Sequence, residues 1–115
     1  MKPLTKFKKI YVYSDFVDMR KAIGGLTTIV GTEIGAGLFD SSLFVFCSKS
    51  RKNLKMVYWD DTGFALWNKK LEKQTFKWLV DAEENTVFLR PALLKLLLAG
   101  VDLKTHEKLE YKRVC

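Results

Sequence analysis

The sequence has little of what a catalytic or metal site needs, with one histidine and two cysteines in 115 residues. The cysteines, Cys47 and Cys115, are too few for the disulfide framework of a small secreted domain. His106 lies in a charged segment with no acid or nucleophile pattern around it, and with two distant cysteines it does not complete a zinc site. We therefore expect no catalytic residues, no metal and no other cofactor, in a protein that is not an enzyme.

Long apolar runs are also missing. The longest candidate, residues 92–99, is interrupted by Lys95 and falls far short of the ~20 residues of a membrane span. The basic residues 1–9 are not followed by the apolar region and cleavage site of a secretory signal. These features predict a cytoplasmic protein without a membrane partner.

Acidic residues and glycines form no recognised chemical motif. Ser14 or Asp15 is interpreted as the N-cap of a helix, with Asp18 in its first turn. Asp60 and Asp61 are interpreted as part of a turn in which Gly63 is free to adopt a positive φ. These roles are commoner for aspartate than metal binding. No Gly-Lys-Ser/Thr follows the glycines of residues 24–37, so the sequence has no phosphate loop.

Positive charge is abundant and occurs in patches. Twenty Lys and Arg residues against thirteen Asp and Glu give a net charge of +7. Residues 1–14 and residues 41–55 each contain four of these cations and no acid. Patchy basic charge is typical of a polyanion partner, with nucleic acid ahead of anionic membrane. The alternative is a solvated surface that keeps the protein soluble.

A hydrophobic content of 48% excludes a disordered chain, and no linker or repeat divides the sequence. We expect one domain over residues 1–115, with frayed tails at 1–7 and 104–115. The fold class is predicted to be α+β, an antiparallel sheet of about four to six short strands with one helix packed on it and a Leu-rich C-terminal helix. The predicted strands are 7–13, 43–47, 54–59, 64–68, 76–78 and 86–89, and the predicted helices are 16–30 and 91–99.

Residues 43–69 are expected to form a three-stranded antiparallel meander with a basic tip. Lys49, Arg51 and Lys52 lie in the first turn, where they would meet phosphates if the hairpin lay along a nucleic-acid groove. The alternative is an edge hairpin that its charge protects from aggregation. The three tryptophans of the chain, Trp59, Trp67 and Trp78, are expected in the core rather than stacked on bases.

Several short motifs occur in an order that is specific when taken together. They are Asp18-Met19-Arg20-Lys21-Ala22-Ile23-Gly24-Gly25-Leu26, the run 43–47, Lys55-Met56-Val57-Tyr58-Trp59-Asp60, Gly63-Phe64, Lys69-Lys70-Leu71-Glu72, Phe76-Lys77-Trp78 and residues 93–102. Over about residues 8–103 this order resembles the TnpB, or second-reading-frame, proteins of the insertion-sequence-sixty-six transposon family.

The resemblance implies a non-catalytic accessory protein for transposition of a bacterial mobile element that also encodes a separate transposase. The first hypothesis is that the protein binds transposon-end DNA through its basic hairpin. The alternative is an adaptor that binds the transposase or another element-encoded protein and makes no direct DNA contact. The candidate nucleic-acid-binding residues are Arg20, Lys21, Lys49, Arg51, Lys52, Lys55, Lys69 and Lys70.

Overall fold

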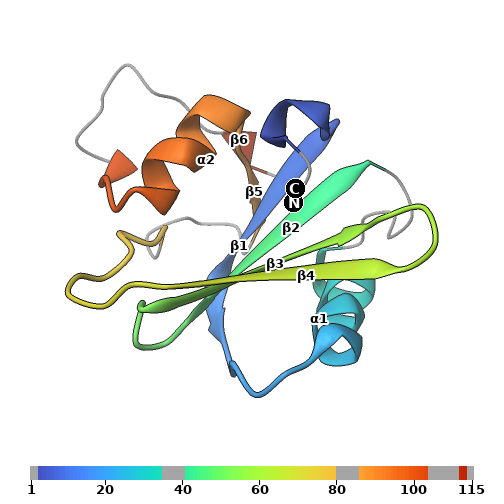
Figure 1. The fold of residues 1–115 in the computed structure, drawn as a ribbon, viewed down its shortest axis with the longest axis horizontal. Helices are drawn as coiled ribbons and strands as arrows, with labels where there is room; N and C mark the ends of the chain where they lie inside the picture. The colour runs from blue at the N-terminus through green and yellow to red at the C-terminus, as the bar shows by residue number, and fades with distance from the viewer. Residues whose placement is uncertain (1–2, 35–40, 80–85, 104–111, 114–115) are drawn as a thin grey trace.

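A six-stranded mixed sheet with the order β4-β3-β2-β1-β5-β6 forms the centre of the molecule in a computed structural model (Figure 1). The structure describes residues 3–34, 41–79, 86–103 and 112–113. The strands are β1 (Lys9–Val17), β2 (Ser42–Ser48), β3 (Asn53–Trp59), β4 (Phe64–Lys70), β5 (Thr86–Phe88) and β6 (Lys112–Arg113). The helices are α1 (Ile23–Ile29) and α2 (Pro91–Leu98), with a short 3-10 helix at Leu4–Lys6 and a π-helix at Val30–Ile34. The predicted α+β class is confirmed.

The predicted meander is confirmed as β2, β3 and β4, which pair antiparallel in sequence order. Cys47 lies opposite Leu54, and Leu54 lies opposite Lys69. Every residue of β2 is buried because both faces of this central strand are covered. The run of apolar residues at 43–47 is the local signal for such a strand.

Strand β1 corrects the prediction of a wholly antiparallel sheet, because it pairs parallel to β2. It continues to Val17, so Ser14 and Asp15 belong to the strand and do not cap a helix. The register shifts between Val12 and Phe16. A parallel pair needs a long crossover connection, and the segment between β1 and β2 includes α1. On its other side β1 pairs antiparallel to β5.

Helix α1 starts at Ile23, later than the predicted residue 16. The strand occupies the first two residues of the predicted helix, 16 and 17, and a turn follows in which the Lys21 N–H donates to the Asp18 carbonyl at 3.0 Å. Leu26 is fully buried as expected, whereas Ile23 is only half-buried at the first helical residue. The helix was predicted to end near Gly31, but Gly31 lies inside the π-helix. Gly35 and Gly37, predicted in the following loop, lie outside the described residues.

Helix α2 is confirmed with its predicted ends. Arg90 precedes it, and Pro91 is its first residue, where the missing N–H costs no hydrogen bond. Gly100 follows the helix with a φ of 88°, a conformation that glycine adopts without strain. The helix buries Leu93, Leu94 and Leu97.

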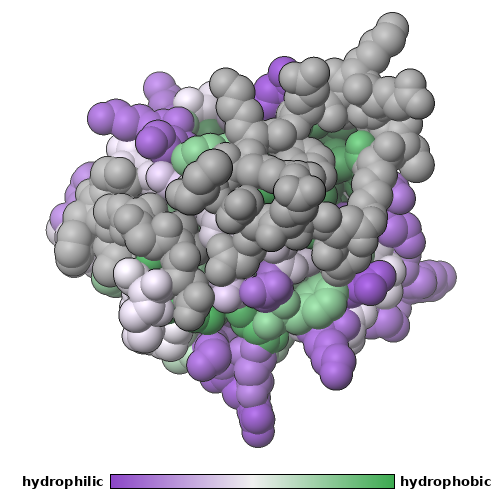
Figure 2. Space-filling view, turned by 180° about the vertical axis from the view of Figure 1, so that it is seen from behind, coloured by the Kyte–Doolittle hydropathy of each residue, from purple (hydrophilic) through white to green (hydrophobic). Residues whose placement is uncertain are grey.

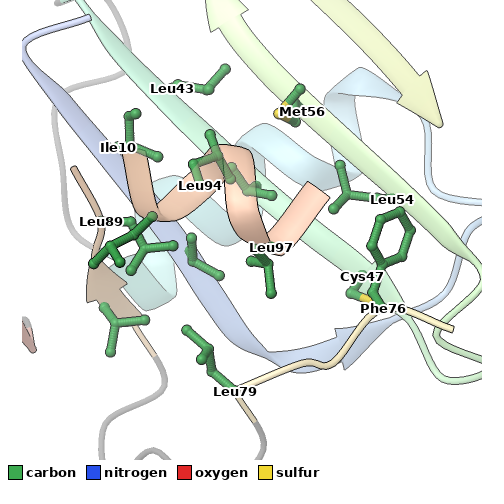
Figure 3. Packing of buried hydrophobic residues seen from close by; sticks show 14 of the residues in the cluster. Ile10, Leu43, Cys47, Leu54, Met56, Phe76, Leu79, Leu89, Leu94 and Leu97 are labelled. Atoms are coloured by element: carbon green, nitrogen blue, oxygen red, sulfur yellow. The ribbon is translucent and has the colours of Figure 1, made fainter. Parts of the chain in front are cut away.

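The two helices lie on opposite sides of the sheet (Figure 1). On the α2 face, Leu94 and Leu97 lie over Ile10, Leu43 and Met56 of the strands (Figure 3). The α1 face has a second cluster, made of Tyr11, Tyr13, Val17, Leu26, Val30, Phe44, Phe46 and Val57.

Two expected core residues are confirmed on the α2 face. Cys47 is fully buried, and this burial raises the pKa of its thiol to about 12. Trp78 is buried, and its indole Nε1–H donates to the Tyr13 carbonyl oxygen at 3.1 Å. Trp59 on β3, the middle strand of the meander, and Trp67 on its edge strand β4 are half-buried.

Three further expectations need correction. Residues 76–78 are not a strand but part of an irregular segment that buries Phe76. In the β3–β4 turn, Asp61 rather than Gly63 has a positive φ, of 52°. Phe7, expected in a frayed tail, is 6% exposed and packs edge-on to the Tyr58 ring.

Most of the C-terminal tail predicted to be frayed lies outside the described residues, and Lys112–Arg113 pair with β5 as β6. That residues 1–115 form one domain stays a prediction. No helix in the described part of the chain is long and apolar enough to cross a membrane.

Candidate nucleic-acid interface

The topology gathers the predicted cations at one end of the sheet. Because β1 and β2 are parallel, with Val17 opposite Ser48, the turn after β1 and the β2–β3 turn leave from the same end. Because β3 and β4 are antiparallel, with Asn53 opposite Lys70, β4 also ends there. We call this region the basic end, made of Arg20, Lys21, Lys49, Arg51, Lys52, Lys55, Lys69 and Lys70.

The β2–β3 turn carries the predicted tip cations. Lys49, Arg51 and Lys52 are all exposed. The Arg51 backbone has a φ of 62°, and its N–H donates to the Ser48 carbonyl at 3.0 Å. The Arg51 guanidinium lies 5.6 Å from the centre of the Phe16 ring, an arrangement typical of a cation–π contact. The tip therefore presents three cations, one of them held over a ring of β1.

The backbone of this turn is braced rather than projecting freely. The Arg51 carbonyl accepts a hydrogen bond from the Phe76 N–H at 2.7 Å, and the Lys52 carbonyl accepts one from the Leu71 N–H at 2.8 Å. The segment after β4 thus fixes the tip through its main chain. The side chains form a fixed basic surface, which differs from the protruding ribbon that the sequence suggested.

Arg20 is exposed but paired with Asp18. Its Nη2 lies 2.6 Å from the Asp18 Oδ2, and its Nε and backbone N–H also donate to that carboxylate. These hydrogen bonds lower the pKa of Asp18 to about 2. The ion pair makes Arg20 less available to a phosphate than its neighbour Lys21, which is also exposed.

Lys55 and Lys69 are half-buried, and their ammonium groups donate hydrogen bonds to backbone carbonyls. The Lys55 ammonium donates to the carbonyls of Met19 at 2.9 Å and Lys21 at 3.1 Å, which ties the turn before α1 to β3. The Lys69 ammonium donates to the Leu98 carbonyl at 3.1 Å, at the C-terminus of α2. These two predicted site residues therefore have a structural role at the basic end.

A hollow of about 440 Å³ opens beside these lysines. Four of its lining residues, Met19, Asn53, Leu54 and Asn68, were not among the predicted site residues. In the sequence each asparagine lies two residues before a lysine, Asn53 before Lys55 in β3 and Asn68 before Lys70 in β4. This alternation is the signal that would have found the two asparagines. The full lining is Met19, Asn53, Leu54, Lys55, Asn68, Lys69 and Lys70.

Comparison with known families decides the assignment, because residues 8–108 match the family described as IS66 Orf2 like protein. The chain belongs to this family. Two similar curated proteins from Sinorhizobium fredii (strain NBRC 101917 / NGR234) carry the names uncharacterized protein y4jC and uncharacterized protein y4hO. The first is 30% identical over 105 residues, covering 91% of this chain and 89% of the relative. The second is 30% identical over 102 residues, covering 89% of this chain and 88% of the relative. No solved structure matches the chain.

Membership of the IS66 Orf2-like family supports an accessory role in transposition, as the sequence resemblance implied. The family is one of accessory proteins and not of known enzymes. Within the described ranges of this IS66 Orf2-like protein, no three His, Cys, Asp or Glu side chains are grouped so that they could hold a metal ion.

Figure 2 shows one face of this IS66 Orf2-like protein, where hydrophilic side chains project at the edges and hydrophobic residues are visible in small separate areas. Long cationic side chains that extend into solvent can follow a phosphate backbone without disturbing the core.

Proposed function

We propose that this protein binds the DNA of its transposable element through the basic end, as a non-catalytic accessory protein in the cytoplasm. The observation that carries the proposal is the meeting of cations from three separate chain segments at one end of one sheet. Phosphate contacts from such a surface position a protein on DNA with little dependence on sequence. Transposon ends are the expected DNA, as the family's role in transposition suggests.

The turn between β3 and β4 lies at the other end of these two strands from the basic end, and it is negatively charged. The β3–β4 turn contains Asp60 and Asp61, both exposed. A duplex attracted to the basic end would therefore be repelled from this turn.

Five cations of the basic end are available for phosphates. They are exposed and are not tied to a carbonyl or a carboxylate in the described part of the chain: Lys21, Lys49, Arg51, Lys52 and Lys70. Each phosphate neutralised on duplex DNA contributes about −0.9 to the slope of log affinity against log salt. If all five make contact, the slope is about −4.5.

The test is binding of the purified protein to element-end duplex and to random duplex, followed by fluorescence anisotropy between about 50 and 200 mM salt. Replacing Lys49, Arg51 and Lys52 together by Ala should flatten the slope by up to about three units. The matched control replaces Lys6, Lys8 and Lys9, which are exposed at the start of β1, at the other end of the sheet. Neither triple should change the free energy of unfolding by more than ~0.5 kcal/mol, because all six side chains lie on the surface.

Equal weakening by the two triples would mean that only net charge matters, which contradicts a specific role for the basic end. Absence of binding by the native protein at about 50 mM salt, where phosphate contacts are strong, would favour the adaptor. One observation supports that second candidate. Strand β4 lies at the edge of the sheet and carries half-buried Phe64, Leu66 and Trp67, so a strand of the transposase could pair with it.

A further inference from the structure

The hollow at the basic end has a regular arrangement of polar groups. Asn53 lies directly opposite Lys70, and Lys55 lies directly opposite Asn68, in the β3–β4 ladder. Directly opposed residues share a face of the sheet, and residues two apart on one strand share it too. The four side chains therefore form a two-by-two array on one face, in which each cross-strand pair places an amide beside an ammonium.

One wall of the hollow is held in place by Lys55. Its ammonium donates to the carbonyls of Met19 and Lys21, which brings the turn before α1 against β3. An ammonium has three donors, so these two bonds leave one for a ligand. Met19 adds an apolar and polarizable surface to the same hollow.

The lining points to a particular ligand chemistry. On the face of the sheet that Asn53 and Asn68 share, it contains two lysines, Lys55 and Lys70, and no carboxylate, which suits a phosphate. The Lys69 ammonium lies on the other face, at the Leu98 carbonyl. A phosphate alone needs only donors, whereas the two amides offer acceptors as well, as the edge of a nucleobase requires. The volume, about 440 Å³, lies in the range of small-molecule pockets.

We infer that this hollow takes one unpaired nucleotide of a DNA strand, with its base against Asn53, Asn68 and Met19 and its phosphate at Lys70. The inference rests on the proposed DNA binding and adds a preference that phosphate contacts alone do not create. A paired base keeps its Watson–Crick edge and its stacked ring faces inside the helix, so a blunt duplex cannot place a whole base in the hollow. The protein should therefore prefer DNA with a single-stranded overhang.

The experiment compares two DNAs that share one duplex sequence, one blunt and one with an overhang of about four nucleotides. At the same salt concentration, the native protein should bind the overhang DNA about tenfold more tightly, as expected when one base is held by stacking or paired hydrogen bonds. Replacing Asn53 and Asn68 together by Ala leaves the charge unchanged and should bring this ratio close to one. The control replaces Thr5 and Thr62, two exposed polar residues away from the basic end, and should keep the ratio.

The outcomes separate the inference from the function on which it rests. Salt-dependent binding with equal affinity for both DNAs overturns the nucleotide site and leaves the basic end as a duplex-binding surface. A preference that survives in the folded double variant also overturns the site. If the double variant does not fold, Asn68→Ala alone decides, because Asn68 is exposed and its loss should spare the fold. Failure to bind either DNA overturns both proposals.

Discussion

The two faces of the sheet are covered in different ways. In the described part of the chain, nineteen buried residues form the cluster on the α2 face and eight form the cluster on the α1 face. The larger cluster draws on α2, on the segment after β4 and on Leu103, and it is rich in leucine. Half of the smaller one is aromatic, with the Tyr11 and Phe44 rings stacked at a centroid distance of 5.2 Å.

This difference separates stability from binding. Burial of apolar surface is the main source of folding free energy, so the α2 face should contribute more of it. The α1 face is covered by a helix of seven residues, Ile23–Ile29. At the basic end this face is also closed by polar contacts, through the Lys55 ammonium and two carbonyls, beside the apolar side chains of Val17 and Met19.

The largest expected effect compares one leucine from each helix. Leu94 on α2 and Leu26 on α1 are both fully buried. Leu94→Ala should lower the free energy of unfolding by about 4–5 kcal/mol, because its many fixed neighbours cannot fill the cavity. Leu26→Ala should cost about 2–3 kcal/mol, because the short helix can move inward. Urea denaturation of the two variants gives both values.

The comparison of faces fails if Leu26→Ala costs as much as Leu94→Ala. That result would mean that α1 is held as rigidly as α2 and that the aromatic cluster is the stronger core.

The parts of the fold that the sequence predicts are those with strong local signals. The meander follows from apolar runs separated by polar turns, and α2 follows from a proline at its start and Gly100 after its end. The parallel pairing of β1 was missed because it depends on contacts between residues about 30 positions apart, such as Val12 and Val45. The start of α1 was missed because Ser14 and Asp15 have the composition of a cap while their backbone continues the strand.

The candidate site likewise has features with a local sequence signal and features that depend on contacts between distant residues. The tip cations are predictable because a basic turn between two apolar strands is a local pattern. The roles of Lys55 and Lys69 are not, because their carbonyl partners lie 29 to 36 positions away along the chain. The hollow needs both the β3–β4 register and the position of the 18–21 turn, which only the fold brings together.

An effect of intermediate size is expected from Lys55 and Lys69, which link the basic end to opposite faces of the sheet. Lys55→Met should lower the free energy of unfolding by about 1–2 kcal/mol, because two charge-assisted hydrogen bonds to the α1 side are lost. Lys69→Met should cost about 1 kcal/mol or less, because only one bond to α2 is lost. Chemical denaturation of each variant tests the order, with Lys70→Met as an exposed control that should leave stability nearly unchanged.

This expectation fails if Lys69→Met lowers the free energy of unfolding more than Lys55→Met does, or if both change it as little as Lys70→Met. Either result would mean that the hydrogen bonds of Lys55 do not stabilise the α1 face.

The smallest effect concerns the exposed ion pair in the turn that leads to α1. Hydrogen bonds from Arg20 lower the pKa of Asp18 to about 2, compared with about 3.9 for an unperturbed aspartate. A depressed folded-state pKa means that the pair stabilises the protein above the unfolded-state pKa and that this contribution is lost as pH falls towards 2. Asp18→Asn should therefore lower the melting temperature slightly at neutral pH, and the difference from the native protein should disappear as pH falls from about 4 to about 2. In an Arg20→Gln background the pH-dependent difference should become smaller but not vanish, because the guanidinium is lost while the backbone N–H of residue 20 still donates to the Asp18 carboxylate. A difference that persists near pH 2, or that is undiminished in the Arg20→Gln background, would show that Asp18 stabilises the α1 side through some contact other than this ion pair.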